Sequence, residues 1–155
     1  MAAGGGSAIE TEGTGCRFPV PDPHLPLIEE LTPAPEPWDV CLRLAGLPNL
    51  LFLDSAIPGG ELGRYSFLTA EPFSWLRSRG RQVWLDGVRQ PIADPFAVLA
   101  EQRTRWPTET IPDLPPFQGG AAGLFGYDLC HHLERLPRPR FDEFQVPDLA
   151  LGFYD

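Results

Sequence analysis

Apolar and polar residues alternate in short segments along most of this chain, and the period of the alternation changes from one segment to the next. Residues 38–47 place Val40, Leu44 and Leu47 at helical spacing before a proline, which predicts a short helix. Residues 49–56 and 64–72 are apolar runs separated by the turn "PGGELG". These two runs predict a hairpin of two strands.

The next segment, residues 74–90, alternates apolar and polar residues in the way that is typical of strands. It is interrupted at Gly80 and again at Asp86 and Gly87, and an Asp-Gly pair is a strong signal for a tight turn. We therefore expect two further hairpin turns here.

Two more helices and one strand are predicted in the second half of the chain. Asp94 precedes Pro95 and a periodic apolar segment, so residues 94–106 should form a helix with Asp94 as its N-cap. Residues 127–137 carry leucines at positions i, i+4 and i+7 and predict a helix that a proline ends. Residues 146–155 predict a last strand.

Four glycines stand in the stretch "PFQGGAAGLFGYDL", at Gly119, Gly120, Gly123 and Gly126. Their spacing matches neither the dinucleotide-binding nor the P-loop pattern. Alternation along a strand leaves both faces almost without side-chain bulk at Gly120 and Gly123. We therefore expect another backbone or a second sheet to pack closely there, rather than a ligand.

These elements indicate an α/β (α+β) fold with mixed, mainly antiparallel sheets and a few short helices. Residues 1–36 are small, polar or proline-rich and are expected to form a mobile leader, with a structured domain over residues 37–155. The chain stops on a predicted apolar strand, which we expect to leave an unprotected edge. The sequence therefore reads as the front part of a longer protein.

Charge and cysteine content narrow the function classes. A net charge of -9 disfavours nucleic acid and anionic membranes as partners, and all 12 basic residues are arginine, so Schiff-base chemistry through lysine is excluded. Cys16, Cys41 and Cys130 are too few and too widely spaced for a disulfide framework or a zinc site. No signal peptide or membrane-spanning run is apparent, so the expected location is cytoplasmic.

The residues offer no convincing catalytic centre or metal site. His131 and His132 are adjacent on a predicted helix, where side chains diverge by about 100°, so we interpret them as solvated histidines. Asp128 and Glu134 are six residues apart and do not share a helix face. No nucleophile and base stand in a recognisable order either.

One polar constellation remains, at the end of the first predicted hairpin. Asp54 and Ser55 follow one strand, and Arg64 and Ser66 lie on what should be its neighbour. A carboxylate, two hydroxyls and a guanidinium could hold the ammonium and carboxylate of an amino acid. Alternatively, these groups satisfy one another at the hairpin end.

Several segments resemble the N-terminal region of component I of the chorismate-utilising synthases. The resemblance runs from Trp38 to Asp155 and is carried by "LLFLDSA", "GRYSFLTAEPF", "PFQGGAAGLFGYDL", "HLERLP" and "VPDLALGFYD". The likeness is greatest to the aminodeoxychorismate (para-aminobenzoate) synthases, with the anthranilate synthases next. The resemblance implies a two-layer α/β assembly of orthogonal antiparallel sheets. In this assembly the N-terminal part of the enzyme packs onto a larger, C-terminal chorismate-binding part.

The resemblance implies an enzyme that replaces the C4 hydroxyl of chorismate with ammonia on the way to folate. A glutamine amidotransferase subunit would deliver the ammonia, and Mg²⁺ would be bound by the C-terminal chorismate-binding domain, which this chain lacks. The family's catalytic residues lie in that same domain, so none is carried over and this chain alone is expected to be inactive.

The resemblance also implies a tryptophan pocket. Ser55 matches a serine that contacts tryptophan in the family, and Asp54 stands where glutamate is common. Arg64, Tyr65 and Ser66 match the neighbouring pocket strand. Two alternatives stay open: a segment of an anthranilate synthase, where tryptophan acts as feedback inhibitor, and a free-standing amino-acid-binding or docking module.

Overall fold

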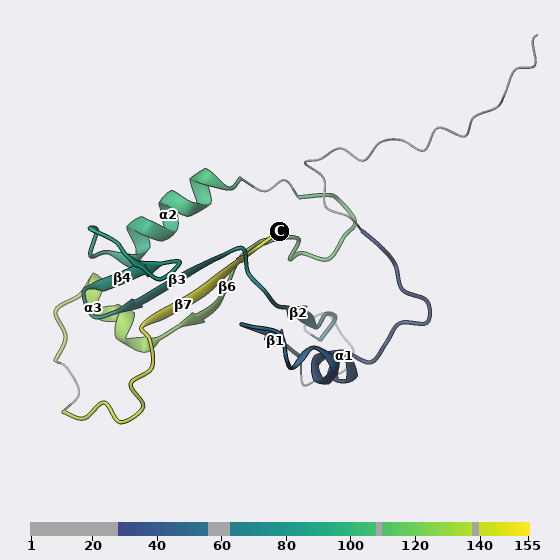
Figure 1. The fold of residues 1–155 in the computed structure, drawn as a ribbon, viewed down its shortest axis with the longest axis horizontal. Helices are drawn as coiled ribbons and strands as arrows, with labels where there is room; N and C mark the ends of the chain where they lie inside the picture. Colours follow the sequence, from purple (N-terminus) through teal and green to yellow (C-terminus); the bar gives the residue numbers. More distant parts are fainter. Residues whose placement is uncertain (1–27, 56–62, 108–109, 138–139) are drawn as a thin grey trace, which may run out of the picture. The chain divides into compact units, whose positions relative to one another are not determined.

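The computed structural model describes residues 28–55, 63–107, 110–137 and 140–155. Residues Leu31–Asp155 form one unit, to which the following description applies (Figure 1). The predicted leader lies outside the described residues up to position 27, and residues 28–36 are exposed and form neither helix nor strand. The predicted turn at residues 58–63 also lies almost entirely outside the described residues.

Short helices and antiparallel strands make up the described part of the chain, which confirms the fold class. The helices are α1 (Pro37–Leu44), α2 (Pro95–Arg105), the 3₁₀ helix η1 (Tyr127–Leu129) and α3 (Cys130–Leu133). The strands are β1 (Leu51–Leu53), β2 (Phe67–Thr69), β3 (Ser74–Arg79), β4 (Gln82–Leu85), β5 (Val88–Arg89), β6 (Gly120–Phe125) and β7 (Leu149–Tyr154). No described helix has both the length and the apolar character that crossing a membrane requires.

Strands β1 and β2 form the predicted hairpin, and it makes a small sheet of its own. The strands are antiparallel, with Leu51 opposite Thr69 and Leu53 opposite Phe67. On one side of the hairpin, Phe52 contacts Trp38 of α1, with 6.1 Å between the ring centroids. The short helix predicted before the hairpin is therefore present and touches the hairpin through this ring contact.

The other five strands form a second antiparallel sheet in the order β5-β4-β3-β7-β6. Both predicted turns are present, one at Gly80 and one at Asp86 and Gly87. Asp86 and Gly87 have φ angles of 50° and 78°, as a two-residue hairpin turn requires. The Asp86 carboxylate also accepts hydrogen bonds from the Ser74 hydroxyl at 3.1 Å and the Trp75 N–H at 2.7 Å, and so holds the turn against the start of β3.

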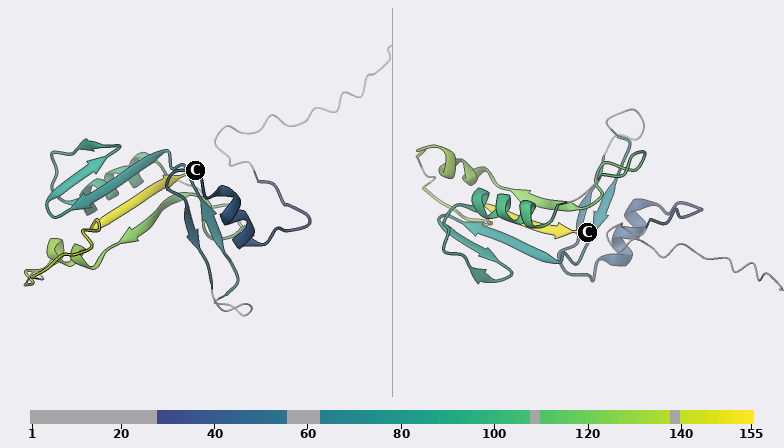
Figure 2. Two further views of the ribbon diagram at one scale, coloured as in Figure 1. Left: turned by 60° about the horizontal axis from the view of Figure 1, so that its bottom comes forward. Right: turned by 90° about the horizontal axis from the view of Figure 1, so that it is seen from above.

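Helix α2 covers one face of this sheet (Figure 2). It begins as predicted, because the Asp94 carboxylate accepts a hydrogen bond of 2.9 Å from the Phe96 N–H and Pro95 fills the first position. Its buried Val98 packs into the core between helix and sheet. The buried residues of that core are Leu76, Val83, Val98, Leu129, Leu149, Leu151 and Phe153.

The predicted last strand forms, but the expectation that it is an unprotected edge is wrong. Strand β7 pairs with β3 on one side and with β6 on the other, so it lies inside the sheet. Its alternate residues Leu149, Leu151 and Phe153 are buried in the core. The glycine-rich β6 and the two-residue β5 are the edge strands of this sheet instead.

The glycines of β6 divide into two kinds. At Gly123 a Cβ atom would overlap the Ala150 carbonyl oxygen and lie 3.2 Å from the Leu151 Cα, which confirms the predicted close approach of another backbone. That backbone is the neighbouring strand β7. At Gly120 the prediction is wrong, because nothing that the structure describes lies within 4 Å of the Cβ position.

The helix predicted over residues 127–137 is much shorter than expected. It consists of η1 and α3 and ends at Leu133, well before Pro137, with Glu134 already extended at ψ 160°. Of the three periodic leucines only Leu129 is buried, whereas Leu133 is 73% exposed. A short helix is stable mainly through its packing, and this apolar stripe packs only at its first turn.

Candidate functional site

The end of the β1–β2 hairpin brings together the five residues that the sequence predicted as a ligand site. Asp54 and Ser55 directly follow β1, and Arg64, Tyr65 and Ser66 directly precede β2. Because Leu53 pairs with Phe67, the next positions outward on the two chains face each other. The hairpin register therefore sets which of the five residues meet.

Asp54 and Ser66 form one pair. The Ser66 hydroxyl donates a hydrogen bond of 2.6 Å to the Asp54 carboxylate, and both residues are exposed. No hydrogen bond from a described residue engages the other carboxylate oxygen of Asp54, so within this part of the chain it can accept from an ammonium group. This pair realises the alternative that the polar groups satisfy one another, and it still leaves acceptor capacity for a ligand.

Ser55 and Tyr65 form a second pair, and both are half-buried. The Ser55 hydroxyl donates to the Tyr65 carbonyl oxygen over 3.4 Å. Tyr65 lies on the same side of the hairpin as Phe67, because their rings are 5.9 Å apart and side chains two positions apart share a face. Ser66 therefore points to the opposite side, and the five residues do not line a single surface.

Arg64 is the one cation of the group. Its guanidinium lies over the Tyr65 ring, 5.0 Å from the ring centroid, in a cation–π contact. It forms no ion pair with any residue that the structure describes. Its donors are therefore available to a carboxylate that approaches Tyr65.

Sequence reasoning missed the aromatic wall beside these groups. Phe117 stands just before the glycine-rich strand and meets Phe67 edge-on, with 6.0 Å between the ring centroids. The two phenylalanines are 50 positions apart in the chain, so only the tertiary fold brings them together. With Tyr65 they form an apolar surface next to a guanidinium and a hydroxyl, which suits an amino acid with an aromatic side chain.

Nothing in the described segments resembles a catalytic or metal centre. They contain no group of three or more His, Cys, Asp or Glu side chains that could hold a metal ion, so the Mg²⁺ implied by the resemblance has no ligand set among them. His131 corrects one interpretation, because its side chain is only 10% exposed and lies 3.7 Å from the Asp128 carboxylate. Cys41 and Cys130 are free thiols, and Cys16 lies outside the described residues.

Comparison with known proteins finds consistent relatives. An alignment of 142 positions that covers 85% of this chain shows 36% identity to anthranilate synthase component 1 of Pseudomonas aeruginosa, and it covers 28% of that protein. An alignment of 119 positions that covers 73% of this chain shows 36% identity to aminodeoxychorismate synthase component 1 of Escherichia coli, and it covers 26% of that protein. The corresponding protein of Salmonella typhimurium is 36% identical over 70% of the chain and is covered to 25%. No family model matches the chain.

The chain thus spans about a quarter of the length of the curated relatives that it matches. The similarity covers most of the chain itself, so it reaches beyond the glycine-rich motif to the hairpin and the sheet.

Proposed function

Because the chain belongs to the family formed by anthranilate synthase component 1 and aminodeoxychorismate synthase component 1, we propose that it is part of a synthase that converts chorismate. The observation that carries this proposal is the 36% identity to members of both kinds over 70–85% of the chain. The relatives are about four times as long as the matched region, and we place the catalytic residues and the Mg²⁺ site in the part without a counterpart here.

The product we propose is 4-amino-4-deoxychorismate, the precursor of para-aminobenzoate in folate synthesis. The uninterrupted "FQGGAAGLFGYDL", which resembles the folate enzymes, favours this choice. The ammonia would come from a glutamine amidotransferase subunit, and the reaction would take place in the cytoplasm.

Anthranilate synthesis is the second candidate, and one observation favours it. The match to the Pseudomonas aeruginosa anthranilate synthase component 1 extends over 85% of the chain, further than the 73% and 70% of the aminodeoxychorismate synthases. The percentage identity is the same for all three relatives, so this argument for an anthranilate synthase rests only on how much of the chain is matched.

In either enzyme, the role we propose for the hairpin end is to bind tryptophan. The half-buried side provides the groups: the Ser55 hydroxyl for the ammonium, the Arg64 guanidinium for the carboxylate, and the rings of Tyr65, Phe67 and Phe117 for the indole. Asp54, held by Ser66, would add negative charge near the ammonium from the exposed side. The contacts are few and mostly half-exposed, so the rest of the synthase would have to complete the pocket.

A product assay tests this function. The full-length synthase that contains this chain is incubated with chorismate, ammonia and Mg²⁺, and the products are separated by chromatography. We expect 4-amino-4-deoxychorismate, and no conversion by the 155-residue chain alone. Anthranilate as the product would replace the first candidate with the second, and conversion by the isolated chain would show that catalytic residues lie within it.

A further inference from the structure

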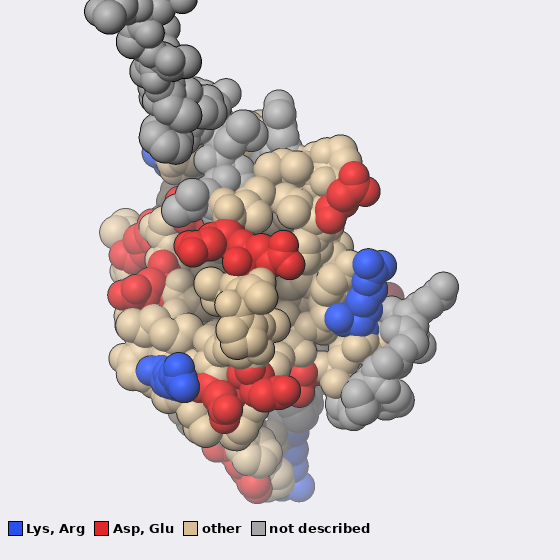
Figure 3. Space-filling view, turned by 90° about the vertical axis from the view of Figure 1, so that its right-hand side faces the viewer, with Lys and Arg blue, Asp and Glu red and all other residues tan. Residues whose placement is uncertain are grey.

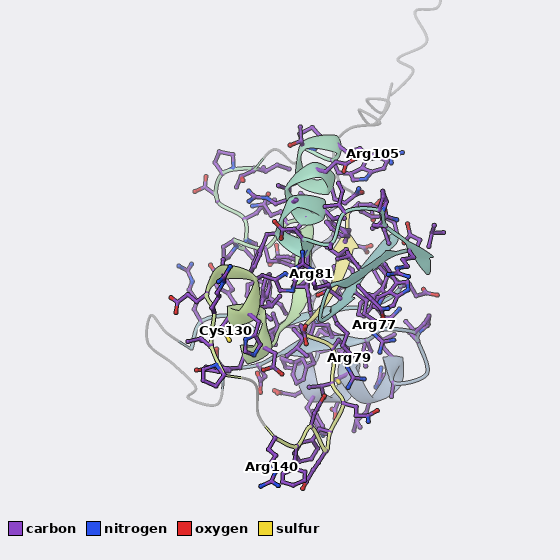
Figure 4. The ribbon with its side chains drawn as sticks, turned by 90° about the vertical axis from the view of Figure 1, so that its left-hand side faces the viewer. Arg77, Arg79, Arg81, Arg105, Cys130 and Arg140 are labelled. Atoms are coloured by element: carbon purple, nitrogen blue, oxygen red, sulfur yellow. The ribbon has the colours of Figure 1, made fainter. Side chains whose placement is uncertain are left out.

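The face of the five-stranded sheet that points away from α2 carries an unusual set of side chains. Leu76 and Val83 point into the core, so the residues that alternate with them point to the opposite side. Figure 4 shows Arg77 and Arg79 on the side of the strands away from α2. We call this surface the arginine–tryptophan face; on β3, β4 and β5 it consists of Trp75, Arg77, Arg79, Gln82, Trp84 and Arg89.

Three of these side chains form a row across the sheet. Arg77 of β3 is directly opposite Trp84 of β4, and Trp84 is directly opposite Arg89 of β5. The two arginines therefore flank the indole and are two strand spacings apart, or roughly 9.5 Å at the backbone. Residues in such a row share one face, so a single partner segment can touch all three.

The charge of this row is not compensated within the described residues. Arg77 and Arg89 are exposed and form no ion pair with any residue that the structure describes. Arg79 differs, because its guanidinium donates to the Asp142 carboxylate at 2.8 Å. None of the strand residues on this face is acidic, although the chain as a whole has a net charge of -9.

A different side of the molecule makes the contrast clear. Figure 3 shows another side of the molecule, where acidic side chains predominate and arginines are scattered between them. An uncompensated row of arginines on an acidic protein attracts negative charge locally, while the remainder of the surface repels it.

The face is also hollowed and aromatic. Trp75 and Trp84, both half-buried, line an open hollow of about 480 Å³ together with Arg77, Arg79, Gln82 and Gly87. Tryptophan and arginine are among the residues enriched at the energetic centres of protein interfaces. Two indoles around a hollow are therefore more typical of a binding surface than of a sheet face that only contacts water.

We propose that the arginine–tryptophan face docks an acidic polypeptide segment of another protein. Carboxylates of that segment pair with Arg77 and Arg89, and an aromatic side chain of the segment enters the hollow beside Trp75 and Trp84. A nucleic acid fits less well, because its long continuous negative charge would meet the acidic remainder of the surface within a Debye length.

The proposal is tested with a defined probe, a random copolymer of glutamate and tyrosine, whose binding to the 155-residue chain is measured by calorimetry at several salt concentrations. We expect binding that weakens as salt rises, and that weakens about tenfold in the double variant Arg77→Gln, Arg89→Gln, because two exposed charge contacts are lost. Poly-glutamate, which has no aromatic side chain, should bind less tightly than the copolymer.

The double variant Arg103→Gln, Arg105→Gln is the matched control. It also removes two positive charges, from exposed positions on α2 on the other side of the sheet, and should leave copolymer binding unchanged. Circular dichroism confirms that each variant remains folded; the exposed arginines are not part of the core.

Three results would overturn the proposal: no binding of the copolymer, an equal loss of binding in the control variant, or tighter binding of a single-stranded oligonucleotide of the same charge than of the copolymer. These results are independent of the product assay, since the full-length synthase with both arginines replaced should still convert chorismate with free ammonia.

Discussion

Gly123 offers a sharp test of how β6 is built, because two separate effects oppose any side chain there. Its φ of 148° lies in a range that residues other than glycine rarely adopt, and a Cβ would overlap the Ala150 carbonyl oxygen of β7. A backbone atom inside the sheet cannot rotate away as a side chain can. Gly123→Ala must therefore push the two strands apart or change the local backbone.

Two neighbouring glycines separate these effects. Gly120 has a similarly unfavourable φ of 111° but open space around it, so Gly120→Ala measures backbone strain alone, at about 1–3 kcal/mol. Gly126 has an ordinary φ of -74° but a Cβ there would lie 2.9 Å from the Asp148 carbonyl oxygen, so Gly126→Ala measures crowding alone, also at about 1–3 kcal/mol. Gly123→Ala should combine both costs, at about 2–6 kcal/mol.

The freedom of an edge strand limits the cost. Because β6 pairs only with β7, it can move outward and relieve part of the overlap, at the expense of ladder hydrogen bonds. We therefore expect a value in the lower half of the range for Gly123→Ala.

Thermal unfolding followed by circular dichroism is the assay. For a chain of this size about 1 kcal/mol corresponds to about 2–4 °C in Tm, so Gly123→Ala should melt at least that much below both Gly120→Ala and Gly126→Ala. Equal melting of Gly123→Ala and Gly120→Ala would mean that the approach of β7 does not constrain this position, and would favour the ligand role for the glycines that close packing replaced.

Three further results are expected. Asp94→Ala should lower the free energy of unfolding by about 1 kcal/mol in urea titrations, because it removes the bond to the Phe96 N–H, whereas Asp94→Asn should retain most of it; no difference between the two would contradict the cap. Burial raises the pKa of Tyr154 above its ordinary value of 10.0, so the unfolded chain loses this proton first and the free energy of unfolding should fall as the pH rises past 10. Tyr154→Phe should reduce that fall. A pH profile that is the same in the variant and the wild type would show that Tyr154 does not cause it. Ser55→Ala should weaken tryptophan binding to the full-length synthase roughly ten- to a hundredfold in calorimetry after bound ligand is stripped by refolding, and equal affinities would remove Ser55 from the site.

The elements that could be predicted from the sequence are those whose cause is local. The Asp94 cap and the turn at Asp86 and Gly87 depend on residues within a few positions of one another, and the structure has both as expected. The β1–β2 hairpin also joins segments that are close in sequence. Alternation identified β3 and β4 as strands for the same reason, and β7 was identified from its own apolar residues.

The errors arose where distant parts of the chain decide the outcome. Leu133 and Leu136 repeat at helical spacing, yet a helix persists only where its stripe finds a surface, and that depends on segments far away in the sequence. The position of β7 between β3 and β6 has the same origin: its partners Leu76 and Gly123 lie far earlier in the chain, and nothing in residues 146–155 specifies them.

The candidate pocket combines both situations. The pairings of Asp54 with Ser66 and of Ser55 with Tyr65 follow from the hairpin register, so grouping these residues required only local reasoning. Strand alternation places these two pairs on opposite sides of the hairpin. Most of the candidate ligand contacts therefore lie on the half-buried side, with Ser55 and Tyr65. The wall that Phe117 contributes depends on how the segment before β6 meets the hairpin. Because the glycine-rich strand and the hairpin are thus joined through Phe67 and Phe117, a substitution that displaces β6 should also disturb the candidate pocket.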